Sequence, residues 1–162
     1  IREAWKEADL ILTTGGVSVG EKDLLPGVIE NLTGNVLFHG IQVKPGMPTM
    51  LSVVNGTPVL SLSGNPFAVE ALFEVLAGGY LTDMEAGRYL QKNQMKILKQ
   101  TFVKTGKMKR IVKGRCDESG VYLPQIQKNG QLKNGIGSNC LVIFPEGERT
   151  YTEGEAVRVI RI

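Results

Sequence analysis

The stretch Leu60-Ser-Leu-Ser-Gly-Asn-Pro-Phe67 decides the fold, because it leads an apolar strand through a glycine turn directly into a helix. Asn65 is a good N-cap residue, and Pro66 suits the first helical position, where its missing N–H is not needed. The next apolar residues recur at the spacing of one helical face: Val69, Leu72, Phe73 and Leu76. The sequence therefore predicts an amphipathic helix, ending near Gly78, that packs against a sheet.

Gly64 makes this turn a candidate binding site. Without a side chain there, the first free N–H groups of the helix and the positive end of its dipole face open space at a strand's carboxyl end. That arrangement is typical of an anion site. The same residues also fit an ordinary strand-to-helix connection that binds nothing, and the turn alone does not decide between the two.

The composition argues against several classes of protein. The chain has 162 residues, 42% of them hydrophobic and 22% charged, which suits a globular protein of one domain or two small ones. A formal net charge of +3 is too small to indicate nucleic-acid binding. No apolar run is long enough to span a membrane, and no cleavable leader is recognisable. We therefore expect a cytoplasmic protein with neither a nucleic-acid nor a membrane partner.

The cysteines and the histidine do not suggest a metal centre. Cys116 and Cys140 lack metal-ligand or redox spacing and indicate buried free thiols. His39 is the single histidine, and we assign it to a strand rather than to catalysis. The chain starts with Ile1 in place of Met, and residues 2–8 look like the end of a helix already under way. We therefore expect a fragment of a longer protein.

The first half of the chain has the pattern of an α/β domain. Leu10–Leu12 is a short apolar run, as in a strand buried on both faces of a parallel sheet. The loop 13–23, rich in Gly and Thr, follows at its carboxyl end, where open α/β sheets bind ligands. A helix over about 23–33, capped by Asp23, and a strand over 36–38 complete a strand–helix–strand unit.

Two loop features follow. Pro45 and Pro48, on either side of Gly46, predict an extended loop that displays Lys44. Asn55-Gly56 between two apolar runs is one of the strongest signals for a β-hairpin. This hairpin leads the chain into the turn and helix described above.

Beyond about residue 85 the pattern changes to short strands separated by turn residues, as in a small antiparallel sandwich or barrel. The expected strands lie at 95–104, 108–116, 121–127, 140–144 and 156–162. We therefore predict an α/β domain over 1–85 and an all-β domain over 86–162.

The sequence contains three motifs in a fixed order: Gly15-Gly-Val-Ser-Val-Gly-Glu-Lys-Asp23, Lys44-Pro-Gly-Met-Pro48 and Ser63-Gly-Asn-Pro66. Together they resemble the C-terminal half of molybdopterin molybdenumtransferases, the enzymes that complete the molybdenum cofactor, and the related E domain of gephyrin. Family members carry Gly-Gly-Val-Ser-Val-Gly-(Glu/Asp)-x-Asp, Lys-Pro-Gly-x-Pro and Pro-Gly-Asn-Pro at about this spacing. The resemblance covers essentially the whole chain.

The resemblance implies a fold and a reaction. The fold is a molybdopterin-binding α/β domain with a doubly wound, mostly parallel sheet, incomplete at its N-terminus, followed by a small all-β, barrel-like domain. The reaction is insertion of molybdenum from molybdate into adenylylated molybdopterin with release of AMP, with Mg²⁺ as cofactor. The implied partners are a second copy of the full-length protein and a molybdopterin adenylyltransferase, and the fragment alone is expected to be inactive.

The resemblance also assigns roles to residues that match the motifs. Asp23 is assigned to catalysis and to Mg²⁺, although an N-cap role would also explain it. Lys44 is assigned to catalysis through the oxyanions of molybdate or phosphate, although a merely solvated lysine gives the same signal. The cofactor-binding set, whose glycines could equally serve only to turn the chain, is Gly15, Gly16, Ser18, Gly20, Ser63, Gly64, Asn65 and Pro66.

Some positions depart from the family pattern. Met47 stands where a basic or small residue is common, and Ser63 stands where the third motif begins with Pro, so we expect altered substrate contacts there. In family members the β domain brings an arginine and a serine-rich turn towards the partner subunit's active site. Here Arg110, Lys113 and Lys133-Asn134 match that feature only loosely.

Two other functions stay open. The same α/β domain occurs in molybdopterin adenylyltransferases and in competence/damage-inducible proteins, where it binds pterin or nucleotide without insertase activity. The β domain argues against this alternative, because those relatives lack it in this form. A gephyrin-like scaffold would need a receptor-peptide groove, and no sequence feature demands one.

Overall fold

The computed structural model describes residues 1–18, 20, 23–78, 81, 93–124 and 137–162. These residues form two compact units. The first comprises Ile1–Gln42 and Gly46–Leu72, and the second comprises Val43–Pro45 and Phe73–Ile162. The predicted domain boundary at residues 85 and 86 lies outside the described residues.

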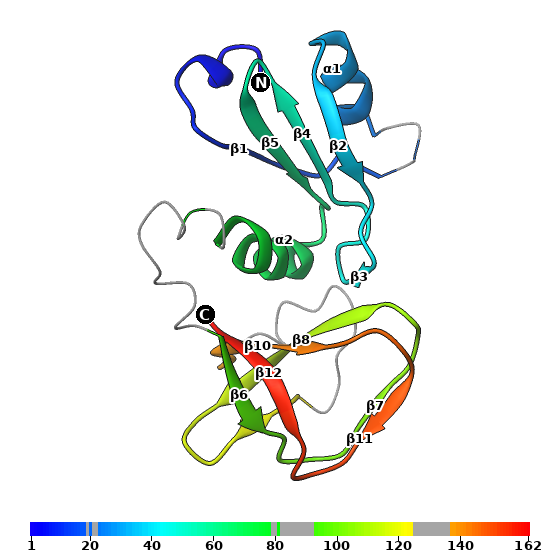
Figure 1. Cartoon of the computed structure of the whole chain (residues 1–162), viewed down its shortest axis with the longest axis vertical. Helices are drawn as coiled ribbons and strands as arrows, with labels where there is room; N and C mark the ends of the chain where they lie inside the picture. Colours follow the sequence, from blue (N-terminus) through cyan, green and yellow to red (C-terminus); the bar gives the residue numbers. More distant parts are fainter. Residues whose placement is uncertain (19, 21–22, 79–80, 82–92, 125–136) are drawn as a thin grey trace. The chain divides into compact units, whose positions relative to one another are not determined.

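The first unit is a four-stranded sheet with helices (Figure 1). Its elements are η1 (Ala4–Lys6), β1 (Ile11–Thr14), α1 (Leu25–Asn31), β2 (Asn35–His39), β4 (Met50–Val54), β5 (Thr57–Leu62) and α2 (Pro66–Leu72). The strand order is β1-β5-β4-β2, with β1 parallel to β5 and the other two pairings antiparallel. This mixed sheet differs from the mostly parallel sheet that we expected. The cause is the predicted hairpin, because the short turn at Asn55-Gly56 can join β4 and β5 only as antiparallel neighbours.

One hydrophobic cluster of the first unit lies between the sheet and α1, and further buried residues lie on β5 and α2. Met50, Val54 and Val59 of the strands are fully buried, as is Ile29 of α1. Val17 from the glycine loop joins this cluster with 1% of its surface exposed. The partly buried residues that pack around the cluster are Ile1, Trp5, Ala8, Leu25 and Leu32. The loop that was predicted to bind a ligand is therefore anchored by its own hydrophobic residue.

The helix α1 begins later than the sequence predicts. Its N-cap is Leu24, which makes no capping hydrogen bond, and Pro26 stands in its first turn. Asp23, the expected N-cap, instead accepts a hydrogen bond from the Gly20 N–H at 2.8 Å. The prediction of a capping role for Asp23 is therefore wrong, because the carboxylate closes the preceding loop.

The helix α2 begins as predicted. The side-chain Oδ1 of Asn65 accepts a hydrogen bond from the Ala68 N–H at 3.1 Å, and Pro66 is the first helical residue. The chain then continues into a π-helical turn, η2 (Phe73–Ala77). Gly46 in the Lys-Pro-Gly-Met-Pro motif has a φ of +103°, and a Cβ there would lie 2.2 Å from Leu72 Cδ1. A glycine is therefore required where this loop passes the helix.

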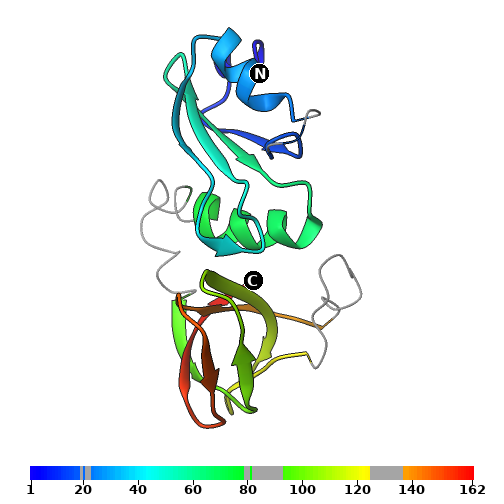
Figure 2. The ribbon, with the colours of Figure 1, turned by 90° about the vertical axis from the view of Figure 1, so that its right-hand side faces the viewer.

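Apart from η2, the described elements of the second unit are β-strands, as expected for residues 86–162 (Figure 2). Its strands are β3 (Val43–Lys44), β6 (Asn93–Ile97), β7 (Phe102–Lys104), β8 (Lys109–Cys116), β9 (Val121–Tyr122), β10 (Cys140–Phe144), β11 (Arg149–Tyr151) and β12 (Ala156–Arg161). One sheet has the order β3-β8-β10-β12-β6 with β9 beside β8, and β7 pairs with β11 in a second sheet. Among the described strands β3 and β6 are open edges of the larger sheet, so these strands do not close into the barrel that we expected.

The strand predictions for this unit were largely correct. The strand at 140–144 has the predicted bounds, and all its residues are buried because it lies between β8 and β12. The predicted strand 95–104 is in fact two strands, β6 and β7, and β11 was not predicted. The predicted strand 121–127 begins as β9, and its end lies outside the described residues.

Aromatic rings and free thiols fill the core of the second unit. The ring of Phe144 stacks on Phe102 with centroids 4.6 Å apart and lies 4.7 Å from the ring of Tyr151. Cys116 and Cys140 are buried free thiols in the same cluster, which confirms the prediction. Burial, together with a hydrogen bond between the two thiols, raises the pKa of Cys140 to about 12, so this thiol stays protonated at neutral pH.

A buried lysine joins two turns of this unit. Lys104 on β7 is only 1% exposed, and its Nζ donates hydrogen bonds to the backbone oxygens of Gly106, at 2.8 Å, and Gly147. Gly106 lies in the turn that follows β7, and Gly147 lies in the turn that precedes β11. Because Lys104 pairs with Arg149 in this antiparallel ladder, the ammonium group fixes both chain segments at one end of the β7–β11 pair.

We expect Lys104→Met to lower the free energy of unfolding by about 1.5–3 kcal/mol. The variant keeps most of the apolar stem but leaves both carbonyl oxygens without their charged donor. Denaturant-induced unfolding measures the change. The matched control is the exposed Lys107→Met, which should stay within about 0.5 kcal/mol of the wild type. Equal losses in the two variants would contradict this interpretation of Lys104.

Candidate functional site

The glycine loop and the glycine turn meet at the carboxyl ends of two parallel strands. Gly15 follows β1 and Gly64 follows β5, and the Gly15 N–H donates to the Leu62 oxygen at 2.9 Å. A Cβ built on Gly64 would lie 3.5 Å from the Cα of Gly15. Gly15 has a φ of +78°, which favours glycine and turns the loop away from the strand. The two backbones are therefore in contact, with no side chain between them.

The rest of the loop is held by neighbouring elements. The Gly16 oxygen accepts a hydrogen bond from the Leu25 N–H at 3.0 Å, which fixes the loop to α1. His39 Nε2 donates to the Val17 oxygen at 2.7 Å, which fixes it to β2. His39 thus has the structural role that we assigned to it. Ser18 is exposed, and nothing in the described residues engages its hydroxyl.

Asp23 and Gly20 close the end of the loop. The Asp23 N–H donates to the Gly20 oxygen at 2.9 Å, and the Asp23 carboxylate accepts from the Gly20 N–H. Only Oδ2 of the carboxylate is used, and Oδ1 has no partner among the described residues. Mg²⁺ is commonly held by one or two carboxylates together with substrate phosphates, so Asp23 fits the role of a single protein ligand. The described residues contain no group of three or more His, Cys, Asp or Glu side chains arranged for a metal ion.

The turn Ser63-Gly-Asn-Pro66 presents backbone rather than side chains. Gly64 and Pro66 are exposed, and the Asn65 side chain is occupied by the helix cap. Ser63 is 8% exposed, and its Oγ has no hydrogen-bond partner in the described part of the chain. Two hydroxyls that sequence reasoning did not select, those of Thr13 and Ser61, are also buried without a partner.

Lys44 belongs to the second unit, whereas the other predicted site residues belong to the first. It is exposed, as the sequence predicted, and lies in β3, which pairs in parallel with β8. The residue opposite Lys44 in this ladder is Arg110. Residues at the same register extend from the same face of a sheet, so two cationic side chains lie side by side. The sequence had offered Arg110 only as a loose match, because this pairing of two segments far apart in the sequence could not be foreseen.

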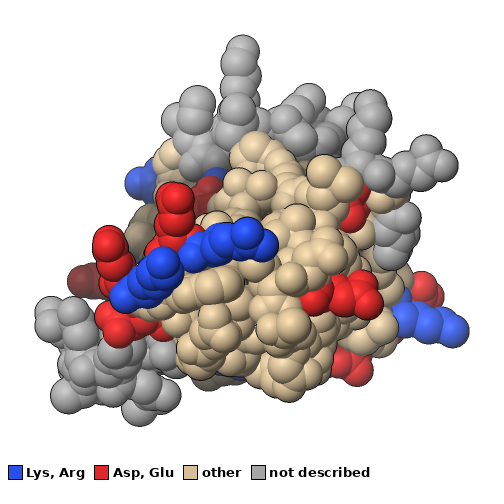
Figure 3. Space-filling model, turned by 90° about the horizontal axis from the view of Figure 1, so that it is seen from above, with Lys and Arg blue, Asp and Glu red and all other residues tan. Residues whose placement is uncertain are grey.

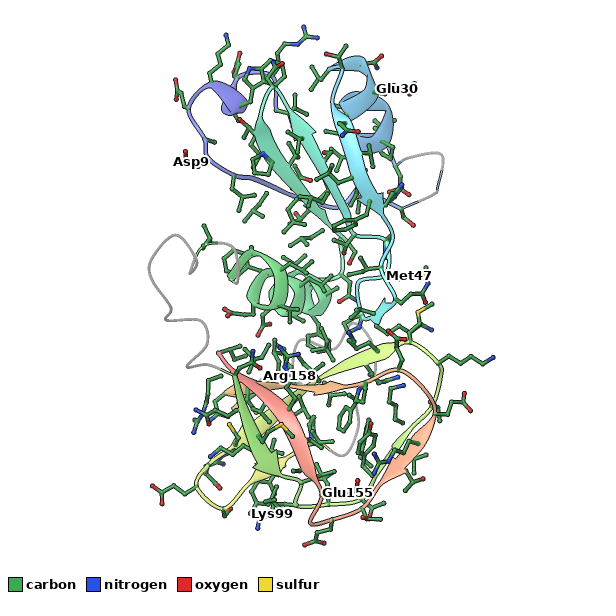
Figure 4. The ribbon with its side chains drawn as sticks, viewed as in Figure 1. Asp9, Glu30, Met47, Lys99, Glu155 and Arg158 are labelled. Carbon is green, nitrogen blue, oxygen red and sulfur yellow. The ribbon has the colours of Figure 1, made fainter. Side chains whose placement is uncertain are left out.

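The remaining predicted positions are less informative. Met47, which departs from the family pattern, is 46% exposed and projects outwards from its loop (Figure 4). Lys133-Asn134 lies outside the described residues. On the face shown in Figure 3, acidic and basic side chains are interspersed among uncharged residues.

No helix within the described ranges is long and apolar enough to cross a membrane.

A family model described as "Probable molybdopterin binding domain" matches residues 1–83, which is half of the chain. The chain belongs to this family. The match includes the glycine loop, the Lys44 loop and the Ser63–Pro66 turn, so the three motifs all lie in a molybdopterin-binding domain.

Relatives extend the similarity of this molybdopterin-binding chain to its whole length. Molybdopterin molybdenumtransferases from Bacillus subtilis and Staphylococcus aureus (strain COL) are 30% and 29% identical, over 100% and 99% of the chain. A structure of the molybdopterin biosynthesis MoeA protein from Pyrococcus horikoshii is 26% identical with a TM-score of 0.79. The chain spans 39% of the length of each of these three proteins.

A further solved structure supports the assignment of the fold but not of a function. The molybdenum cofactor biosynthesis protein from Pyrococcus furiosus is 24% identical, with a TM-score of 0.72, over 99% of this chain and 52% of its own. Because the similarity runs across both units, the molybdopterin-binding domain and the strands that follow it match these proteins together.

The Asn65 cap can be tested in isolation. We expect Asn65→Ala to lower the free energy of unfolding by about 1 kcal/mol, because the Ala68 N–H loses its acceptor at the start of α2. Asn65→Asp should retain most of the stability, since its carboxylate can accept the same hydrogen bond. Thermal and denaturant unfolding of the variants provide the measurement. Equal stability of the alanine and aspartate variants would exclude a capping role.

Proposed function

We propose that the chain is the molybdopterin-binding part of a molybdenumtransferase, which inserts molybdenum from molybdate into adenylylated molybdopterin and releases AMP. The observation that carries this proposal is the contact between Gly15 and Gly64, because it leaves bare backbone at the carboxyl ends of two parallel strands. Ligands of open α/β sheets bind at such ends. The names of the relatives supply the identity of the ligand and of the reaction.

In this proposal the glycine loop and turn receive the pterin and the phosphate. Gly15, Gly16, Gly20 and Gly64 admit the ligand close to the backbone, whose N–H groups can donate to phosphate oxygens. Ser18 is exposed in the same loop, and its hydroxyl can add a further donor. Asn65 and Pro66 fix the turn, and the Asn65 side chain acts through the helix rather than on the ligand.

Asp23 would hold Mg²⁺ through the carboxylate oxygen that Gly20 does not use. When bound, Mg²⁺ would neutralise charge on the phosphate oxygens while the bond to AMP breaks. The hydrogen bond from the Gly20 N–H to Oδ2 keeps the carboxylate oriented. Asp23 therefore combines a structural bond with a free ligand atom.

Lys44 and Arg110 would bind molybdate. Molybdate is a tetrahedral dianion, and a lysine point charge beside a two-pronged guanidinium offers several donors to its oxygens. The two side chains occupy the same register of neighbouring strands. This pairing favours a role for Lys44 beyond that of a solvated surface lysine.

The remaining parts of the proposal concern the longer protein. The relatives are about two and a half times the length of the chain, so activity is proposed for a full-length protein that acts in the cytoplasm as a homodimer. A molybdopterin adenylyltransferase would supply the adenylylated substrate. A binding module without insertase activity is the second candidate, and similarity across the second unit argues against it.

The first test measures AMP release from adenylylated molybdopterin by the full-length protein, with molybdate and Mg²⁺. We expect Asp23→Asn to reduce the rate at least about tenfold, because an amide is a weaker Mg²⁺ ligand than a carboxylate. Glu30→Gln, an exposed carboxylate on α1 (Figure 4), is the matched control and should retain the wild-type rate. Lack of AMP release by the folded wild type would refute the proposed function, and an unchanged Asp23→Asn rate would refute the role of Asp23.

The second test addresses molybdate. We expect Lys44→Ala and Arg110→Ala each to raise the molybdate concentration for half-maximal AMP release about tenfold, because each removes a charge-assisted hydrogen bond. Lys109→Ala is the control, since Lys109 directly precedes Arg110 in β8 and its side chain therefore points to the opposite face of the sheet. If Lys109→Ala has the same effect as Arg110→Ala, general surface charge rather than the Lys44–Arg110 pair attracts molybdate.

A further inference from the structure

Three buried hydroxyls in the first unit have no hydrogen-bond partner among the described residues. They are Thr13 Oγ1, Ser61 Oγ and Ser63 Oγ, and we call them the hydroxyl row. Ser61 is 0% exposed and Ser63 is 8% exposed. Other buried hydroxyls of this unit are paired: Thr57 Oγ1 donates to the Trp5 oxygen at 3.1 Å, and Thr49 Oγ1 to the Gly46 oxygen at 2.7 Å. The unpaired groups are therefore concentrated in one place.

The hydroxyl row lies on neighbouring strands at one end of the sheet. Thr13 of β1 stands opposite Ser61 of β5 in the parallel ladder. Ser61 and Ser63 are two residues apart, so their side chains extend from the same face. Continuation of the ladder by two residues places Ser63 level with Gly15, where the glycine loop meets the glycine turn. The row thus leads from the sheet to the contact of the two glycine segments.

Burial without a partner makes these hydroxyls costly for the fold. An unpaired buried hydroxyl has lost its hydrogen bonds to water without replacing them, and native proteins satisfy most such groups with a partner, a water or a ligand. Three of them at the end of the sheet where ligands bind are difficult to explain by packing alone. A ligand that donates and accepts hydrogen bonds would satisfy them.

The hydroxyls themselves indicate the chemistry of that ligand. Each hydroxyl can donate one hydrogen bond and accept others. Groups that both donate and accept suit a ring edge with alternating N–H, carbonyl and ring-nitrogen groups better than a phosphate, whose ionised oxygens only accept.

We infer that the hydroxyl row binds the hydrogen-bonding edge of the pterin ring, with Ser63 in direct contact with it. This inference rests on the function proposed above. Ser63 adjoins the exposed Gly64, and rotation about a single side-chain bond can direct its Oγ to the ligand. Ser61 and Thr13 stand behind Ser63 and extend its hydrogen-bond network into the sheet. Ser63 occupies the position where the family motif begins with Pro, so this contact is a property of this chain.

The test measures affinity and stability together on Ser63→Ala, Ser61→Ala and Thr13→Val. We expect Ser63→Ala to weaken binding of molybdopterin about 3- to 10-fold, with smaller losses for the other two variants. Without ligand, the melting temperatures should stay equal to or above that of the wild type, because each variant removes an unpaired hydroxyl. Ser63→Thr keeps the hydroxyl and should retain affinity. A lower melting temperature with unchanged affinity would show a structural role and overturn the inference.

A matched control and two probes sharpen the test. Thr57→Val, on the same strand as Ser61, should lower the melting temperature through loss of the bond to Trp5 and leave affinity unchanged. Binding of inorganic phosphate and of AMP should be insensitive to Ser63→Ala. If these probes lose affinity instead of molybdopterin, the row binds phosphate and the pterin assignment is wrong. Equal molybdopterin affinity of all variants overturns the inference but not the proposed function, whereas a folded wild type that does not bind molybdopterin overturns both.

Discussion

The contact between the Gly15 and Gly64 backbones is the constraint on which the first unit depends. It exists because β1 and β5 run parallel and end at the same edge, where the Gly15 N–H reaches the Leu62 oxygen. A non-glycine residue at position 15 would strain a φ of +78°, whereas a Cβ at position 64 would only make van der Waals contact with the Gly15 Cα, at 3.5 Å. Gly15 therefore serves a geometric need, and the absence of side chains at both positions leaves backbone exposed to a ligand.

This constraint explains why the glycine loop carries so many structural bonds. A loop with little side chain of its own has a high conformational entropy when free, so other elements must hold it. Val17 is buried in the core, His39 holds the Val17 oxygen, and the Leu25 N–H holds Gly16. Asp23, expected to cap α1, is used to close the same loop. The energy that orders the loop thus comes mainly from Val17, His39 and Leu25, to which we assign no role in binding.

The sequence predicted correctly those elements that depend on interactions between residues close together in the chain. The Asn55-Gly56 hairpin, the Asn65 cap and the β10 strand each depend on residues within a few positions, and all three are present. Pairings between distant segments were not predictable in the same way. The two residues of β3 form a strand only because β8 lies beside them, and that pairing brings Arg110 to Lys44.

The same difference between local signals and distant pairings applies to the residues of the candidate site. The glycines and Asp23 could be chosen from motifs, because each motif is contiguous in the sequence. The hydroxyls of Thr13 and Ser61 could not be chosen from the sequence. Only the structure shows that these hydroxyls, within strands, have no hydrogen-bond partner among the described residues. An expected β-barrel was also not found among the described strands, because strand periodicity indicates where strands lie but not whether they close into a barrel.

The two units offer different chemistry, and each unit favours a different kind of ligand group. The described groups at the first unit's glycine contact are backbone amides and uncharged hydroxyls, with one carboxylate at the end of the loop. The second unit supplies the adjacent cations Lys44 and Arg110. An uncharged heterocycle would gain little from the cations, and a simple oxyanion would leave the buried hydroxyls unpaired. Within its own unit, therefore, the glycine contact favours an uncharged hydrogen-bonding ring, and the Lys44–Arg110 pair favours an oxyanion.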